Sequence, residues 1–216
     1  MMFDRFARWT PLTGVLFVAL VVAGGPMLAG STPGTGASSA TVAGFYSAHQ
    51  TRERAAAIVL AFSFVAFLGF AATLRSRLRR GRGVEGLAAL LLAAATVLVV
   101  GQSVSEGITY TLTEAPGRLS PAAAQALNLL ANDLVLTSAI GFFTFGLTAG
   151  IAILRASDLP SWLGAWAVVI AVIFVIPPVE FVGFLLLLVW VLALSVVLIR
   201  RDGADVVPAA APLSAG

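Results

Sequence analysis

Long apolar runs separated by short polar segments dominate this sequence. Six of these runs approach the roughly 20 residues that an α-helix needs to cross a membrane, and they lie near 12–29, 55–74, 87–106, 134–154, 161–177 and 180–199. The runs lack the alternation of a barrel strand, and a chain in hydrocarbon must satisfy its backbone hydrogen bonds internally. The pattern therefore predicts an all-α polytopic transmembrane helix bundle, with six spans in a single domain over 1–201.

The distribution of arginine predicts the orientation, because cytoplasmic loops carry an excess of positive charge. With the amino terminus inside, ten arginines fall on the inner side and three, Arg52, Arg54 and Arg118, on the outer side. Five of the ten lie in one loop: Arg75, Arg77, Arg79, Arg80 and Arg82. We therefore expect a multi-pass protein of the bacterial cytoplasmic membrane with both ends inside. The five-arginine loop should fix the topology and contact anionic lipid headgroups.

Two segments have compositions that do not form a core. Residues 31–44 read STPGTGASSATVAG, a Gly/Ser/Thr/Pro composition that predicts a flexible external loop. Residues 202–216 are predicted to be a disordered cytoplasmic tail. The first span could instead be a cleaved signal peptide, although Met27 is not the small residue expected three positions before a cut.

Spans three and four are predicted to be longer than the membrane is thick. Nothing interrupts a helix between Val84 and Thr113, and a second helix can begin at Ser120 with Pro121 in its first turn and continue to Leu154. At 1.5 Å per residue, helices of about 30 and 35 residues exceed a hydrocarbon core of about 30 Å. The pair should therefore project outward as a helical hairpin.

Composition excludes several classes of protein. The chain is 59% apolar and 11% charged, whereas soluble domains carry about 25% charged residues, and its mean hydropathy is +1.00. There is no cysteine and only one histidine, His49, so neither a thiolate site nor a histidine-rich metal site can form within one chain. The pI of about 10.5 reflects a few arginines and does not indicate nucleic-acid binding. No nucleotide or cofactor motif is present.

The candidate chemistry lies near the outer boundary of the predicted bundle. Glu106, Asp133 and Glu180 come from three different spans, and polar neighbours follow at helical spacing. If these faces point inward, they form an acidic pocket that opens outward and attracts a proton, a metal cation or an organic amine. The candidate ligand-binding residues are Glu106, Asp133, Glu180, Gln102, Asn132, His49 and Glu53, with Asn128 on the same face as Asn132.

Other interpretations remain open. The same polar residues could simply mark where the helices leave lipid, since charge is costly mainly at the bilayer centre. The protein would then be a structural or partner-binding protein that uses the hairpin 107–133 and the arginine loop. A membrane hydrolase is disfavoured by the single histidine, although an acid pair such as Glu106 and Asp133 could move protons. The GxxxG of Gly146 and Gly150 fits packing within the bundle better than a dimer face.

The segment RASDLPSWLG at 155–164, together with Glu106 and Asp133, resembles bacterial six-span membrane proteins of a family without known function. The resemblance implies a helical membrane fold and a bacterial membrane, and it implies no activity. The sequence does not name a substrate, and it leaves open a homo-oligomer or another membrane partner.

Overall fold

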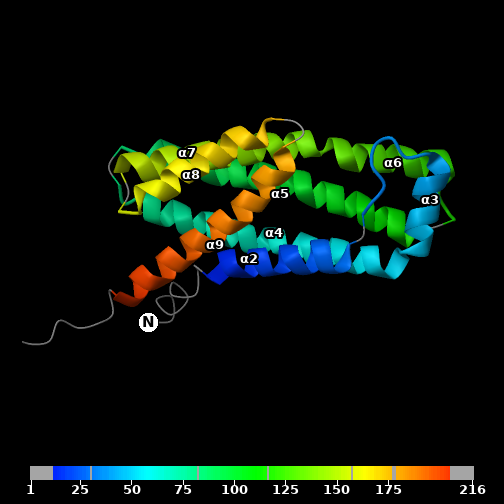
Figure 1. Ribbon diagram of the computed structural model, residues 1–216, viewed down its shortest axis with the longest axis horizontal. Coiled ribbons are helices and arrows are strands. Elements are labelled where there is room, and N and C mark those ends of the chain that lie inside the picture. The colour runs from blue at the N-terminus through cyan, green and yellow to red at the C-terminus, as the bar shows by residue number, and fades with distance from the viewer. Residues whose placement is uncertain are drawn as a thin grey trace, which may run out of the picture.

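The structure is a bundle of helices, most of which run roughly along one long axis (Figure 1). The computed structural model describes residues 12–29, 31–81, 83–115, 117–156, 158–176 and 179–204. Its elements are α2 Leu12–Val22, the π-helical η1 Ala23–Leu28, α3 Ser39–Ala48, α4 Gln50–Leu78, α5 Glu85–Glu114, α6 Pro121–Asp133, α7 Val135–Ala156, α8 Ser161–Phe174 and α9 Glu180–Ala204. The start of α2 and the end of α9 lie at the same end of the bundle, opposite to α3 (Figure 1).

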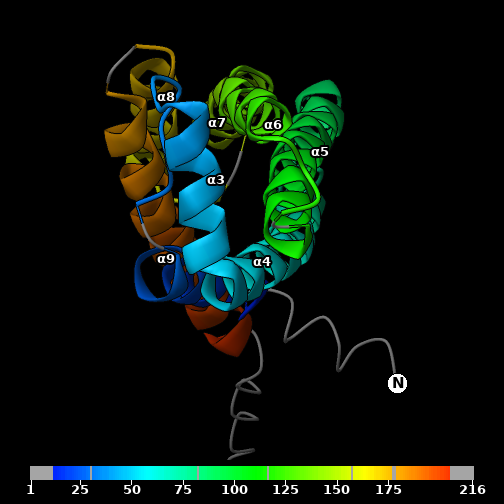
Figure 2. The same cartoon turned by 90° about the vertical axis from the view of Figure 1, so that its right-hand side faces the viewer.

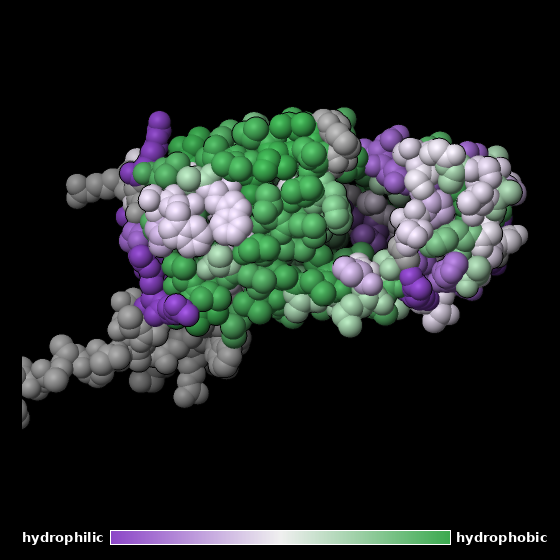
Figure 3. All heavy atoms as spheres, viewed as in Figure 1, coloured by the Kyte–Doolittle hydropathy of each residue, from purple (hydrophilic) through white to green (hydrophobic). Residues whose placement is uncertain are grey.

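The lengths and surfaces of the helices identify a membrane protein. Within the described residues, the helices long and apolar enough to cross a membrane are Gln50–Leu78, Glu85–Glu114, Pro121–Arg155 and Phe181–Arg201. Large apolar side chains such as Phe62, Leu136 and Phe181 are exposed, which water would not favour but lipid does. Figure 3 shows an apolar band with polar residues at both ends. Two shorter apolar helices, Leu12–Leu28 and Ser161–Phe174, accompany these four, so the predicted count of six spans is not decided by length.

Aromatic side chains fill the centre of the bundle. The rings of Phe17 and Phe145 lie 5.0 and 5.1 Å from the ring of Phe67, and Phe70 meets Trp190 edge-on. The indole N–H of Trp190 donates to the carbonyl of Leu163 over 2.8 Å. These residues join α2, α4, α7, α8 and α9 into one core.

Glycines allow the closest helix contacts. A Cβ at Gly141 of α7 would lie 2.7 Å from the backbone of Leu98 in α5. Gly150 of α7 and Gly164 of α8 face each other, and a Cβ on either would lie 2.7 or 2.9 Å from the carbonyl oxygen of the other. Small residues promote helix association in lipid by allowing such close approach. The GxxxG of Gly146 and Gly150 thus packs against α8 of the same chain.

The structure differs from the sequence predictions in three places. Residues 39–44, predicted as loop, form the first part of α3, in which Val42 is fully buried. The predicted helix 120–154 is distorted at Leu134, where α6 gives way to α7. Residues 202–204, predicted as tail, continue α9, and the predicted disorder of 205–216 lies outside the described residues.

The close contact at Gly141 predicts a large effect of one methyl group. The Gly141→Ala substitution should destabilise the protein by about 1–3 kcal/mol, because the added Cβ overlaps the backbone of α5. The matched control is Gly107→Ala, since a Cβ at Gly107 meets nothing within 4 Å and should be neutral or slightly stabilising. Thermal unfolding in one detergent measures both; equal stabilities of the two variants would contradict the contact.

Candidate functional site

A small cap covers the end of the bundle opposite to the start of α2 and the end of α9 (Figure 1). Figure 2, which looks at this end, shows α3 in front of the bundle and leading into α4. The cap has its own apolar cluster, formed by Val42 and Tyr46 of α3, Leu112 of α5 and Ala124 of α6. The hydroxyls of Ser38 and Ser120 accept hydrogen bonds from the backbone N–H groups of Thr41 and Ala123, and so cap the starts of α3 and α6. This part of the projecting hairpin is therefore packed against α3.

One buried amide connects the parts of the cap. Asn128 of α6 is 2% exposed, and its Nδ2 donates to the carbonyls of Pro33 over 3.0 Å and Gly34 over 3.5 Å. Its Oδ1 accepts from the hydroxyl of Tyr46 over 3.3 Å. Asn128 therefore fixes both the segment that precedes α3 and α3 itself on α6.

Beneath the cap lies a polar cavity of about 210 Å³. Two carboxylates reach it, Glu53 from α4 and Glu106 from α5. The remaining lining residues are Ala29, Thr32, Tyr46, Ala56, Ala57, Leu60, Ser105, Thr109, Asn128, Ala131 and Asn132. None of these described lining residues is basic, and Arg52, which is not part of the wall, lies 3.9 Å from the Glu53 carboxylate.

Glu53 is held at the start of α4. Its side chain is 1% exposed, and it lies in the first turn of the helix, where the macrodipole favours a negative charge. The Nε of Arg52 lies 3.9 Å from Oε1 of Glu53 and also donates to the carbonyl of Leu28. Arg52 thus brings the end of η1 next to this carboxylate.

Glu106 lies between the polar cavity and a second, apolar cavity of about 550 Å³. Gln102, one turn earlier on α5, lines only the apolar cavity, and its Nε2 donates to the hydroxyl of Ser138 over 2.8 Å. The hydroxyl of Ser105 donates to the carbonyl of Ala131 over 3.0 Å. These two bonds tie α5 to α7 and α6 within the turn that precedes Glu106.

Tyr46 supplies a neutral hydroxyl to the polar cavity. Burial, together with the smaller effects of the negative charges of Glu53 and Glu106, raises the pKa of Tyr46 to about 12. The phenol therefore stays protonated at physiological pH and keeps its hydrogen bond to Asn128.

The structure brings together only some of the residues predicted from the sequence. Glu53, Glu106 and Asn132 line the polar cavity. Asp133 is exposed and lines neither cavity, so it does not complete the predicted acidic pocket. His49 lies between α3 and α4, where its Nδ1 is 3.0 Å from the carbonyl of Phe45 and its ring packs on the Phe45 ring. Glu180 is the first residue of α9, and its side chain lies outside the described part.

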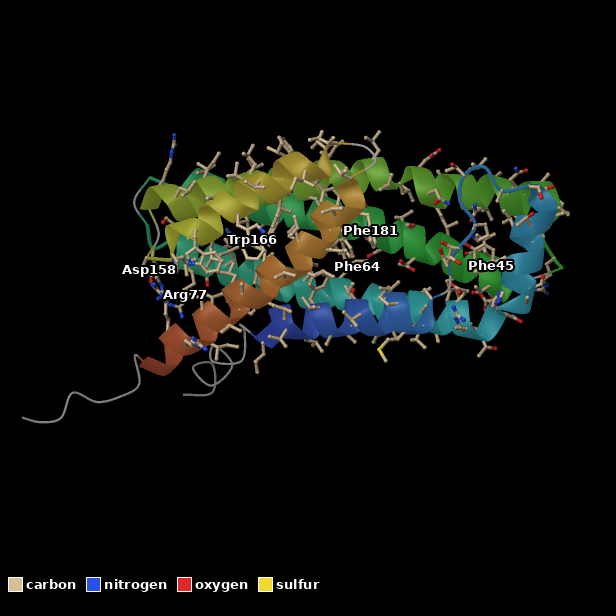
Figure 4. All side chains as sticks on the ribbon, in the orientation of Figure 1. Phe45, Phe64, Arg77, Asp158, Trp166 and Phe181 are labelled. Atoms are coloured by element: carbon tan, nitrogen blue, oxygen red, sulfur yellow. The ribbon has the colours of Figure 1, made fainter. Side chains whose placement is uncertain are left out.

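The arginine loop lies at the opposite end, where Figure 4 labels Arg77 beside Asp158. Arg75 and Arg77 occupy the last turn of α4, and Arg79 and Arg80 are exposed after it; Arg82 lies outside the described residues. Arg77 and Arg80 border a hollow of about 260 Å³ that also contains Asp158, whose carboxylate accepts from Arg201 over 3.0 Å. The contact of this loop with anionic lipid stays a prediction.

The main residues missed from the sequence are Tyr46 and Thr109 at the polar cavity and the walls of the apolar cavity. Tyr46 belongs to α3 and Glu53 to α4, so helical spacing does not connect the two residues. In the sequence, nothing distinguishes the residues that line the apolar cavity from apolar residues that face lipid. Among the described residues, no group of three His, Asp or Glu side chains is placed to hold a metal ion.

No family model, curated protein or solved structure is significantly similar to this chain. The resemblance to a six-span bacterial family therefore stays a prediction.

The hydrogen bonds of Asn128 predict how the cap is held. The Asn128→Ala substitution leaves the Tyr46 hydroxyl and the Pro33 carbonyl without their partner, which costs about 1–3 kcal/mol for each buried group. Hydrogen exchange should accelerate in residues 31–48. The control is Asp133→Ala, an exposed change expected to stay within about 0.5 kcal/mol. Unchanged exchange of 31–48 in Asn128→Ala would show that other contacts hold the cap.

Proposed function

We propose that this protein is a bacterial cytoplasmic-membrane protein that binds an organic ammonium ion from the outer side, in the polar cavity over Glu53 and Glu106. The observation that carries the proposal is the convergence of two carboxylates, from α4 and α5, on one cavity whose described walls contain no basic side chain. Carboxylates that share a poorly hydrated space attract a cation or a proton.

The other groups of the cavity suit an ammonium ion better than a divalent metal. Hard divalent cations require about six oxygen ligands at close range, whereas the cavity offers two carboxylates and the scattered oxygens of Tyr46, Thr109 and Asn132. An ammonium N–H group donates to one acceptor at a time, and charge-assisted bonds to carboxylates are the strongest it can make. A cavity of 210 Å³ leaves room for a small head group.

The proposal also includes the topology. With six spans, the arginine loop and the end of α9 face the cytoplasm, and the cap faces outward. Figure 4 shows Arg77 and Asp158 at one end of the bundle and Phe45 of the cap at the other, so the arginine loop and the cap would lie on opposite sides of the membrane. In a transporter, the outward-facing cavity would be the loading position of the ligand.

The binding proposal is tested by thermal stabilisation of the purified protein with methylammonium, ethylammonium, Na⁺, Mg²⁺ and Ca²⁺. At 100 times its dissociation constant, a ligand should stabilise the protein by about 2.7 kcal/mol. We expect this for the ammonium ions in the wild type and in Asp133→Asn, and no stabilisation in Glu106→Gln. The absence of any stabilisation in the wild type would contradict the proposal and favour the alternative, a structural or partner-binding membrane protein that uses the cap as its docking surface.

The topology is tested with single cysteines, because the natural chain has none. Thr35→Cys and Arg118→Cys are exposed positions at the cap end, and Arg80→Cys and Asp158→Cys are exposed at the opposite end. In intact cells, a membrane-impermeant maleimide should label the first two and reach the last two only after permeabilisation. Labelling of Arg80→Cys in intact cells would contradict the orientation, and labelling of Asp158→Cys without labelling of Arg80→Cys would show that the fourth span does not cross the membrane.

A further inference from the structure

The apolar cavity adjoins the polar one and is larger. Ala29, Leu60 and Glu106 line both cavities, so the two spaces meet at the Glu106 carboxylate. The apolar cavity holds about 550 Å³, within the range of roughly 300–1,000 Å³ that is usual for small-molecule sites. In the space-filling view of Figure 3, a hollow opens where the apolar band meets the polar end.

The walls of the apolar cavity come from helices that diverge. In Figure 1, α9 crosses the bundle diagonally and moves away from α2 and η1 toward the cap. Figure 4 shows Phe64 of α4 and Phe181 of α9 on either side of this opening. Val21, Gly25 and Leu185 are among the other residues that line this cavity.

Few polar groups line this cavity. Among its described lining residues, the polar side chains are Ser31, Gln102 and Glu106. The amide nitrogen of Gln102 is occupied by the Ser138 hydroxyl, which leaves Glu106 as the charged group at the junction. Because Phe181 and Leu185 at its rim are also exposed on the surface of the bundle, an apolar chain can enter from the lipid side.

Resting on the proposed function, we infer that the ligand is a single-tailed amphiphile, whose ammonium head binds at Glu106 and Glu53 and whose alkyl chain fills the apolar cavity. The shared wall at Glu106 sets the order of the two parts: a charged head in the polar cavity and a tail directed between α2, η1 and α9. A lipid phosphate is disfavoured as the head, because both carboxylates would repel it.

The test compares ethylammonium with dodecylammonium on protein in lipid nanodiscs, with affinities expressed by the free aqueous amine and empty nanodiscs as the reference. Dodecylammonium should bind more tightly, by up to about fourfold for each CH₂ group that leaves water for the cavity. Dodecanoate, with a similar tail and a carboxylate head, should not bind to the site.

Variants of the protein test the binding of the ammonium head and of the alkyl tail separately. Gly25→Leu and Val21→Phe narrow the apolar cavity; a Cβ at Gly25 meets nothing within 4 Å, so this change should leave the fold intact. We expect both variants to bind ethylammonium normally and dodecylammonium about tenfold more weakly, a loss of about 1.4 kcal/mol. Glu106→Gln should weaken the binding of both amines. The control, Leu136→Phe, alters an exposed apolar residue of α7 that lines neither cavity, and it should change neither affinity.

The outcomes of the two proposals differ. The amphiphile inference would be wrong if ethylammonium binding depends on Glu106 but the affinity for dodecylammonium is unchanged in both narrowed variants. The proposed ammonium site would remain supported in that case. Failure of both amines to bind the wild type would overturn the site itself. Equal binding of dodecanoate and dodecylammonium would show that the tail alone is recognised, and would also overturn the inference.

Discussion

The amide of Asn128 is the constraint on which the outer half of the structure depends. An amide that is 2% exposed must find partners for its polar atoms, and Asn128 finds them in Pro33, Gly34 and Tyr46. The segment 31–48 is thereby held against α6, and it closes the space between α4 and α5 at the cap end of the bundle. Without this closure, Glu53 and Glu106 would face bulk water, where a carboxylate attracts a cation only weakly because the dielectric constant is high.

The inner half of the structure follows a different rule. Helices in lipid gain little from the hydrophobic effect, and they associate through close packing of small residues. The contact of Gly141 with Leu98 and the facing pair of Gly150 and Gly164 join α5, α7 and α8 tightly, whereas α9 crosses obliquely and leaves the apolar cavity beside α2 and η1. The two halves meet at Glu106. Hydrogen bonds of the cap close the polar cavity on one side of this residue, and the oblique crossing of α9 leaves the apolar cavity on the other.

Apolar run length and helix capping predicted most of the fold. The predicted segment 55–74 lies within α4, and the predicted helix 84–113 nearly coincides with α5, because long apolar helices in hydrocarbon leave the backbone few alternatives. Composition failed at 39–44, where Ser38 caps a helix and Val42 is buried by tertiary packing. At the cavity, helical spacing predicted Glu53 and Glu106 as candidates, and both line it; their binding of a ligand stays a prediction. Helical spacing could not show that Asp133 points away from the cavity, since that depends on the rotation of α6 about its axis. It also could not show a cavity between α9 and η1, because that cavity depends on the angle between the helices.

The most direct measurement of the central claim uses two adjacent positions of α6, of which Asn132 lines the polar cavity and Asp133 is exposed. In Asn132→Cys and Asp133→Cys, the rate of reaction with a small cationic thiol reagent is measured with and without saturating ethylammonium. The account predicts that ethylammonium slows the reaction at position 132 by about tenfold or more, and leaves position 133 unchanged. Equal rates at position 132 with and without the amine, under conditions in which the unfolded protein reacts fully, would contradict a ligand site between Glu53 and Glu106.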